Sequence, residues 1–249
     1  MSRILVVEHE SQCPPAHLGT WLTEAGGRLE VCRPWAGDEL PAVTAYDGLV
    51  VLGGSMGAYD DDLHRWLAPT RELLGEAVDR ELPTLGVCLG HQLLAVALGG
   101  TVAVNPRGQQ VGLFEVGWCD VAGSDDLVGG LGAVRGVQWN SDVVVEVPDG
   151  STVLAETPHG ELQVARYGPR AWGVQLHPEV DAPLLRSWAA GDRDDHLERG
   201  IDQDAVLRQV DAAREELERA WRPLAVRFLA LAGAEVTDDR ARRVSGRGR

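Results

Sequence analysis

The sequence predicts an α/β protein with a mainly parallel central sheet flanked by helices, and three observations predict this class. Short, continuous apolar runs alternate with helical patterns through the first half, as is typical of parallel strands buried on both faces. Glycine pairs or a proline end most of these elements. In the second half, β-like runs follow one another with little room for helices, which predicts an antiparallel portion.

In the first half, each element has a clear local cause. Gly26-Gly27 stops the first helix, Gly53-Gly54 closes the third strand, and Pro83 ends a helix whose apolar residues recur at helical spacing. The expected order is strand Arg3–Val7, helix Ala16–Ala25, strand Leu29–Cys32, strand Gly48–Leu52, helix Leu63–Leu82, strand Thr84–Val87 and helix Gly90–Leu98.

The second half is expected to be β-rich and then helical from Ala182 onward. Pro223 lies inside the last helical pattern, Asp204–Ala232, and is expected to kink it or start a new helix. The apolar face of that pattern is expected to pack on the parent domain, with a partner or dimer surface as the alternative. The face comprises Leu207, Val210, Leu217, Trp221, Leu224, Phe228 and Leu231; the β-like runs are Thr101–Val104, Gln110–Val121, Val143–Val147, Val153–Glu156, Leu162–Tyr167 and Ala171–Leu176.

This organisation suggests one domain over residues 1–190, a C-terminal helical extension over 191–232, and an Arg-rich tail over 233–249 that is expected to be disordered. Residues 240–249 carry five arginines and no acid, so with the net charge of −15 residues 1–239 sum to −20. Such a body repels a phosphate backbone, which argues against nucleic acid as a partner.

Composition also argues against lysine-dependent mechanisms, membrane spans and zinc ribbons. All 23 basic residues are arginine, so any mechanism that needs a lysine is excluded, such as a Walker A cradle or a Schiff base. No apolar run approaches the ~20 residues of a membrane span, and Ile4–Val7 is too short for a signal-peptide core. The four cysteines form no C-x-x-C pair, so a zinc ribbon loses support. We therefore expect a cytoplasmic protein without membrane contact.

One segment predicts a nucleophile. Thr84–Gln92 reads strand, then Gly-x-Cys-x-Gly, then helix, which is the nucleophile-elbow pattern with Cys88 in the place of the nucleophile. The flanking glycines suit a turn too tight for side chains. The helix N-terminus that follows favours a thiolate. A buried structural cysteine is the alternative for this segment alone.

A base and an oxyanion site complete the constellation. His177 follows the apolar run Trp172–Leu176, and Glu179 projects to the same side two residues later, with Pro178 locking the backbone between them. A cysteine nucleophile needs such a base and such an orienting acid. The Gly-rich turn Leu52–Gly57 can supply backbone N–H groups for an oxyanion. His9, Cys13 and His17 could shape the pocket, and Asp60-Asp61-Asp62 is expected to be a solvated loop rather than a metal site.

Together, Gly-Val-Cys-Leu-Gly-His-Gln, Gly-Val-Gln-Leu-His-Pro-Glu-Val and Leu-Gly-Gly-Ser resemble the class I, triad-type glutamine amidotransferases over roughly residues 3–190. The resemblance implies the flavodoxin-like fold of that family. It also implies that Cys88 attacks the glutamine γ-carboxamide, that His177 transfers protons, and that Glu179 orients His177. The N–H groups of Gly54 and Leu89 would hold the oxyanion, and Gln92 would contact the glutamine α-carboxylate or α-amino group. No metal or organic cofactor is implied.

The pocket departs from the family pattern at two places. The turn contains Ser55 where the family more often has proline, although Gly-Gly-Ser-Met resembles the turn of GMP-synthase-like amidotransferase domains. In Gln138–Asp142, Asn140 and Ser141 replace the His and Gly of the family's x-His-Gly-Asp segment. Ser55 is expected to loosen the turn without removing its N–H groups, whereas Asn140 and Ser141 bear on pocket shape and donor specificity rather than on the triad. By the resemblance, Gly53, Ser55, Asn140, Ser141 and Asp142 are the remaining expected pocket residues.

Three functions remain open from the sequence. The first is a stand-alone glutaminase that passes ammonia to an unknown acceptor or a separate synthetase subunit. The second is a peptidase or hydrolase of γ-glutamyl compounds, because one triad serves both reactions. The third is a catalytically silent binding or regulatory protein on the same fold. A homodimer is a further expectation for the assembly.

Overall fold

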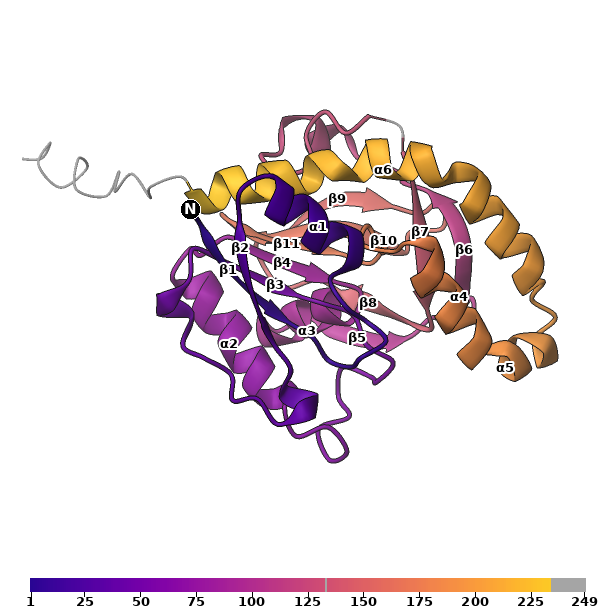
Figure 1. Cartoon of the computed structure of the whole chain (residues 1–249), viewed down its shortest axis with the longest axis horizontal. Helices are drawn as coiled ribbons and strands as arrows, with labels where there is room; N and C mark the ends of the chain where they lie inside the picture. Colours follow the sequence, from indigo (N-terminus) through magenta and orange to yellow (C-terminus); the bar gives the residue numbers. More distant parts are fainter. Residues whose placement is uncertain (133, 234–249) are drawn as a thin grey trace, which may run out of the picture.

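A seven-stranded sheet forms the centre of the protein (Figure 1). The computed structural model describes residues 1–132 and 134–233, so the predicted Arg-rich tail lies outside the described residues from residue 234 onward. The strand order is β2-β1-β3-β4-β11-β10-β9. These strands span Arg28–Cys32 (β2), Arg3–Val7 (β1), Gly48–Val51 (β3), Thr84–Val87 (β4), Ala171–Val174 (β11), Leu162–Gly168 (β10) and Thr152–Glu156 (β9).

The sheet has a parallel part and an antiparallel part. The pairs β2–β1, β1–β3, β3–β4 and β4–β11 are parallel, whereas β11–β10 and β10–β9 are antiparallel. This arrangement confirms the predicted mainly parallel α/β fold. Two smaller antiparallel pairs lie beside the sheet: β5 (Thr101–Val104) with β8 (Asp142–Glu146), and β6 (Gln110–Glu115) with β7 (Arg135–Asn140).

Helices cover both faces of the parallel part, because its inner strands β1, β3, β4 and β11 are buried along almost their whole length and their alternate side chains point to opposite faces. On one face, Ile4 and Val6 join a buried cluster with α1 (Ala16–Glu24) and α6 (Gln203–Gly233). On the other, Leu5 and Val7 pack with α2 (Leu67–Asp79) and α3 (Leu89–Ala97). A third cluster joins α4 (Ala182–Gly191) to α6 and β7, and α5 (Arg193–Glu198) lies between α4 and α6 in the chain.

Of the two outcomes expected at Pro223, a new helix does not start there. Helix α6 is continuous over 31 residues, with Pro223 inside it, and arches over the sheet (Figure 1). Proline removes one backbone hydrogen bond, but the packing of its neighbours holds the helix together. Trp221, Leu224 and Phe228 are fully buried in the first cluster. The alternative in which this apolar face is a docking or dimer surface is therefore wrong.

Element boundaries shift in the β-rich half. The expected strand Gln110–Val121 ends at Glu115 and is followed by a 3-10 turn over Asp120–Ser124. After Glu115 the backbone packs against the end of β9. At Gly117 the approach is so close that a side chain would overlap the carbonyl of Glu156. Strand β7 was not anticipated. Within the described residues, no helix is both long and apolar enough to span a bilayer.

Candidate active site

The candidate site lies at the edge where the parallel strands β1, β3, β4 and β11 end. In open α/β sheets, ligands bind outside the carboxyl ends of the strands. A cavity of about 640 Å³ opens there. Eight of the residues predicted from the sequence line it: Gly54, Ser55, Cys88, Gln92, Asn140, Ser141, Asp142 and His177. The structure thus brings together residues that lie more than 120 positions apart in the chain.

Cys88 occupies the turn between β4 and α3 in a strained backbone conformation. Its φ and ψ are 50° and −108°, a positive φ that non-glycine residues rarely adopt. Its N–H donates to Val174 O at 2.8 Å, which ties the turn to β11. A Cβ on Gly86 would lie 2.5 Å from Gly90 O, and one on Gly90 would overlap the Val51 carbonyl. Both glycines are therefore required by backbone contact.

His177 and Glu179 form a buried pair beyond the end of β11. Nδ1 of His177 lies 2.7 Å from Oε1 of Glu179. Since an ionised carboxylate only accepts hydrogen bonds, the imidazole donates through Nδ1 and leaves Nε2 for a second partner. The backbone N–H of His177 donates to Val137 O at 2.8 Å, and the Trp188 ring packs edge-on at 4.7 Å between centroids. The pair is thus fixed by three elements.

Cys88 and His177 are neighbours across Gly53. A Cβ built on Gly53 would lie 3.3 Å from Cε1 of His177 and 3.6 Å from Cβ of Cys88. Nε2 of His177 is buried and has no hydrogen-bond partner among the described residues. Burial alone lowers the pKa of His177, but the negative charges of Glu179 and Cys88 outweigh it and raise that pKa above its usual 6.5. The site therefore favours a protonated imidazole.

The other cysteines lie in surroundings that disfavour a thiolate. Burial, and then the nearby Glu10 carboxylate, raises the pKa of Cys13 far above its usual range. Its Sγ donates to Glu10 Oε1 at 3.2 Å. Burial likewise raises the pKa of Cys32 to about 11, and that of Cys119 in the same direction. Among these three thiols, none is prepared to act as a nucleophile.

The Gly53-Gly54-Ser55 turn follows β3 and lies against the start of α3. Gly90 N at the start of α3 donates to Leu52 O at 3.1 Å, so the segments that carry the two expected oxyanion donors, Gly54 and Leu89, adjoin. Leu89 is the first residue of α3, where an N–H has no partner within the helix. Glu10 holds the turn from the other side: it accepts from Ser55 N at 2.8 Å and from Ser55 Oγ at 2.9 Å.

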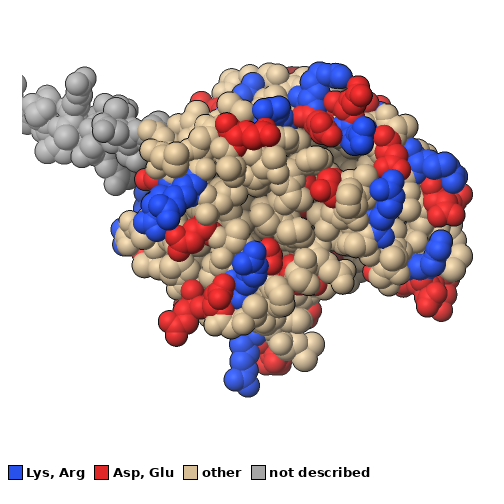
Figure 2. All heavy atoms as spheres, viewed as in Figure 1, with Lys and Arg blue, Asp and Glu red and all other residues tan. Residues whose placement is uncertain are grey.

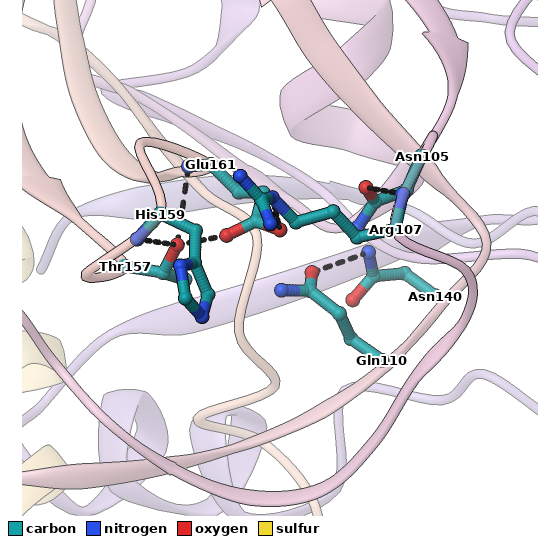
Figure 3. A network of polar contacts seen from close by, with 7 residues as sticks. All are labelled: Asn105, Arg107, Gln110, Asn140, Thr157, His159 and Glu161. Atoms are coloured by element: carbon teal, nitrogen blue, oxygen red, sulfur yellow. Dashed lines mark hydrogen bonds and ion pairs between the residues drawn. The ribbon is translucent and has the colours of Figure 1, made fainter.

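Asn140 and its neighbours form a polar network at one side of the cavity (Figure 3). Nδ2 of Asn140 donates to Gln110 Oε1 at 3.2 Å and to Asp142 O at 3.1 Å, whereas Oδ1 has no partner among the described residues. Nε2 of Gln92 donates to Asp142 O at 3.0 Å and to Gln175 Oε1 at 3.2 Å. Gln92 therefore has only its oxygen left for a ligand, and Asn140 likewise offers an acceptor.

Some sequence expectations lie outside the cavity. Of His9, Cys13 and His17, only Cys13 lines it. His9 is fully buried and accepts from Trp66 Nε1, and His17 stacks on Trp21. Within residues 1–132 and 134–233, no group of three His, Cys, Asp or Glu side chains is placed to hold a metal ion.

Sequence reasoning did not single out several cavity residues, among them Glu10, Trp139 and Trp188. Glu10 follows β1 by three residues, and that position at the carboxyl edge of a parallel strand is the signal that could have identified it. Trp188 and Trp139 reach the cavity from α4 and β7. Trp139 lies within the predicted pocket segment Gln138–Asp142, whereas nothing in the local sequence marks Trp188, because its position depends on how α4 packs.

Comparison with known proteins gives a consistent result. The family model described as "Glutamine amidotransferase class-I" matches residues 22–184. Gamma-glutamyl peptidase 5 of Arabidopsis thaliana is 29% identical over 143 residues, which cover 56% of this chain and 56% of that protein. One subunit of the glutamine-hydrolyzing GMP synthase of Halobacterium salinarum is 38% identical over 151 residues, covering 56% of this chain and 70% of that protein. The crystal structure of a glutamine amidotransferase from Thermotoga maritima superimposes with a TM-score of 0.82 at 26% identity, covering 92% of this chain and 98% of that one.

Proposed function

Because the chain belongs to the class-I glutamine amidotransferase family, we propose that it hydrolyses γ-glutamyl amides through a thioester on Cys88, with glutamine as the donor and its ammonia passed to an acceptor or a separate synthetase subunit. One observation carries this proposal. Cys88 is held at positive φ beside the buried His177–Glu179 pair, in a cavity open to a small ligand. This is the combination of activated nucleophile, base and orienting acid that acyl transfer requires.

Acylation would proceed in two bond changes. Sγ of Cys88 attacks the γ-carbonyl carbon, and the C–S bond forms while the carbonyl oxygen becomes an oxyanion. The N–H groups of Gly54 and Leu89 are the proposed donors to that oxygen. The C–N bond then breaks as the imidazolium of His177 gives its proton to the leaving nitrogen. The raised pKa of His177 supports this role, because it keeps the acid protonated at neutral pH.

Deacylation would use the same groups in reverse. Neutral His177 takes a proton from water, the resulting hydroxide attacks the thioester carbon, and the C–S bond breaks to release glutamate and free Cys88. Glu179 would hold the imidazole in the tautomer with the proton on Nδ1, so that Nε2 is the nitrogen that transfers protons. Within the described residues its carboxylate is hydrogen-bonded to His177 alone, and we therefore treat Glu179 as a positioning residue.

The γ-glutamyl half would be recognised by acceptors for its α-ammonium group. We propose Gln92 through its oxygen, Asn140 through Oδ1, and the Asp142 carboxylate, because all three line the cavity and the first two have their N–H groups engaged within the protein. Gly53, Ser55 and Ser141 would shape the floor and wall against this half.

Two relatives favour a second candidate beside the glutaminase. The Halobacterium relative is named as part of a glutamine-hydrolysing synthase, and the Arabidopsis relative as a γ-glutamyl peptidase. The γ-glutamyl peptidase is favoured by one observation: Asn140 and Ser141 replace the family's His-Gly in the cavity lining. We therefore expect slow ammonia release from free glutamine by the isolated chain.

The test has two parts. Purified chain is mixed with glutamine or with γ-glutamyl dipeptides, quenched in acid, and analysed by peptide mass spectrometry for a γ-glutamyl adduct. We expect the adduct on the Cys88 peptide alone, its absence in Cys88→Ala, and its persistence in the matched control Cys13→Ser. An adduct on another cysteine, or turnover that survives Cys88→Ala, would overturn the proposal.

The same substrates decide between the two candidates. If a dipeptide is cleaved with kcat/KM near ~10⁴ M⁻¹s⁻¹ or above while glutamine is poor, the peptidase assignment replaces the glutaminase. If addition of a separate synthetase subunit raises glutamine turnover, the glutaminase assignment stands. The cytoplasm remains the compartment that we propose, since free thiols and a small soluble substrate suit it.

A further inference from the structure

Two tryptophan rings line the cavity from elements that lie far apart in the chain. Trp139 lies near the end of β7 and Trp188 lies on α4, with their ring centroids 6.2 Å apart and their planes tilted by 50°. The ring of His196, which is fully buried, packs against Trp139 at 5.1 Å between centroids. Trp139 and Trp188 therefore form a fixed surface at the cavity, which we call the aromatic wall.

The polar edges of both rings are engaged within the protein. Nε1 of Trp188 donates to Gln12 O at 2.6 Å, and Nε1 of Trp139 donates to Asp192 Oδ2 at 2.7 Å. These two hydrogen bonds fix the orientation of the rings. An indole has no other hydrogen-bonding group. The aromatic wall can therefore offer a ligand only apolar and π surface.

Across β7 from the aromatic wall, the cavity offers hydrogen-bond acceptors instead. Asn140 follows Trp139 on β7, so the two side chains point to opposite sides of the strand. Oδ1 of Asn140 and Oε1 of Gln109 are buried at the cavity and have no partner among the described residues. A buried acceptor without a donor is costly, so this side suits a ligand that brings N–H groups. The cavity as a whole therefore suits a ligand with a polar head and an apolar tail.

Contact with His177 puts the aromatic wall on the leaving-group side of the cavity. The rings of Trp188 and His177 pack edge-on with their centroids 4.7 Å apart. In the proposed acylation His177 gives its proton to the leaving nitrogen, so that nitrogen must come within hydrogen-bond distance of the imidazole. Because the γ-glutamyl half is assigned to the side of Asn140, a substituent on the nitrogen would extend along Trp188 instead.

The occupant that suits the aromatic wall is a small molecule larger than glutamine. Glutamine releases ammonia, which has no substituent to lie on a ring. The cavity of about 640 Å³ is within the range of ~300–1,000 Å³ found for sites that hold drug-sized ligands. On the face shown in Figure 2, exposed basic and acidic side chains are interspersed over α5, which follows α4 in the chain. Such a surface does not favour an apolar protein partner beside the wall.

We propose that the preferred substrates are γ-glutamyl amides of arylalkylamines, with the aryl group of the leaving amine on Trp139 and Trp188. The proposal rests on the function proposed above and extends its second candidate, the hydrolysis of γ-glutamyl compounds. The C–N bond breaks as the Cys88 thioester forms, the amine leaves with the proton from His177, and water then supplies one oxygen to the γ-carboxylate of glutamate. Trp139 and Trp188 act as specificity residues, because neither gives or takes a proton in these steps.

The experiment compares three γ-glutamyl amides of primary alkylamines: the 2-phenylethyl amide, the 2-cyclohexylethyl amide and the ethyl amide. All three break the same kind of C–N bond, and kcat/KM reports the steps up to acylation, in which the amine is still attached. We expect kcat/KM to fall in that order, with the phenylethyl amide exceeding the ethyl amide by roughly 10- to 100-fold. The cyclohexyl amide separates stacking from apolar burial, because its ring is of similar size but has no π system.

Variants of the aromatic wall locate the preference. In Trp139→Leu and Trp188→Leu, the ratio of kcat/KM for the phenylethyl amide over the ethyl amide should fall several-fold, whereas Trp139→Phe keeps a ring and should retain most of the ratio. Trp139→Leu is the decisive variant, because Trp188 also packs on His177. Trp35→Leu, at an exposed position outside the cavity, likewise removes a tryptophan and should leave the ratio unchanged. Circular dichroism checks that each variant is folded.

The outcomes are distinguishable from failure of the proposed function. The arylalkylamine class is overturned, while the thioester chemistry stands, by any of three results: equal kcat/KM for the phenylethyl and ethyl amides, a cyclohexyl amide that matches or exceeds the phenylethyl amide, or a ratio that Trp139→Leu leaves intact. If no amide and no glutamine acylates Cys88, the proposed function itself fails, and the substrate class fails with it.

Discussion

The elbow at the end of β4 and the outer rim of the cavity contribute to the same site by different physical means. At the elbow, backbone contacts leave almost no freedom: Gly86, Cys88 and Gly90 lie so close to β3 and α3 that neither glycine can carry a side chain. At the rim, Asp60, Trp139 and Asp192 project from a loop, a small β pair and the end of α4. We therefore expect the geometry around Cys88 to be fixed by backbone contacts and the choice of substrate to depend more on the side chains of the rim.

The largest expected effect distinguishing these regions comes from Glu179→Gln. Loss of the charge removes the group that fixes the tautomer of His177, while the amide keeps the shape of the side chain. We expect kcat to fall, with ~10⁴-fold as an upper guide because a cysteine nucleophile needs less help than a serine. Steady-state kinetics with a γ-glutamyl amide measures the fall, and circular dichroism checks that the fold is retained.

The same variant should move the pH profile. In the wild type, Glu179 and Cys88 raise the pKa of His177, so the alkaline limb of kcat/KM should lie well above 6.5. Without Glu179, burial is less opposed and lowers that pKa, so the limb should shift toward lower pH. An unmoved limb together with unchanged kcat would mean that another group orients His177.

The second prediction compares the free energies of unfolding of two variants, Gly90→Ala at the elbow and Gly75→Ala in α2. A Cβ at Gly90 overlaps the Val51 carbonyl, so we expect a loss of about 3 kcal/mol in the free energy of unfolding. At Gly75, inside α2, nothing lies within 4 Å of the added Cβ, and alanine should stabilise by about 0.5–1 kcal/mol. Denaturant unfolding measures both, and a similar change in the two variants would contradict steric control at the elbow.

The smallest effect belongs to the rim, in Trp139→Phe. The variant keeps an aromatic ring but loses the hydrogen bond from Nε1 to Asp192 Oδ2 at 2.7 Å. We expect about 1 kcal/mol of lost stability and less than a tenfold change in kcat/KM for a neutral γ-glutamyl amide. A loss of turnover comparable to that of Glu179→Gln would mean that Trp139 takes part in the reaction itself. The proposed division between a catalytic elbow and a rim that only selects substrate would then be wrong.

The parallel part of the fold was predictable because its causes are local. Strands such as Thr84–Val87 are continuous apolar runs closed by glycine or proline, and the elbow follows from glycines that flank Cys88. His177 and Glu179 could be named as candidates for the same reason, since they lie three and five residues after the end of the buried β11.

The rest depends on contacts between distant segments. The end of β6 is set by the packing of Gly117 against β9, and the continuity of α6 through Pro223 is set by burial of its neighbours on the sheet. Neither contact leaves a local pattern. The aromatic wall was equally hidden, because Trp139 and Trp188 lie on separate elements and only the folded chain brings their rings to one cavity.

Helix α6 has a consequence for how the chain matures during synthesis. Its residues Trp221, Leu224 and Phe228 complete the same cluster that contains Ile4 and Val6 of β1. At about 5–20 residues per second, a ribosome needs on the order of 10–40 s to pass from β1 to α6. During that interval only α1 covers this face of the nascent sheet, so part of the apolar surface of the first strands stays exposed until the last helix emerges. We therefore expect the packing of this face to be completed late, after the rest of the sheet has formed.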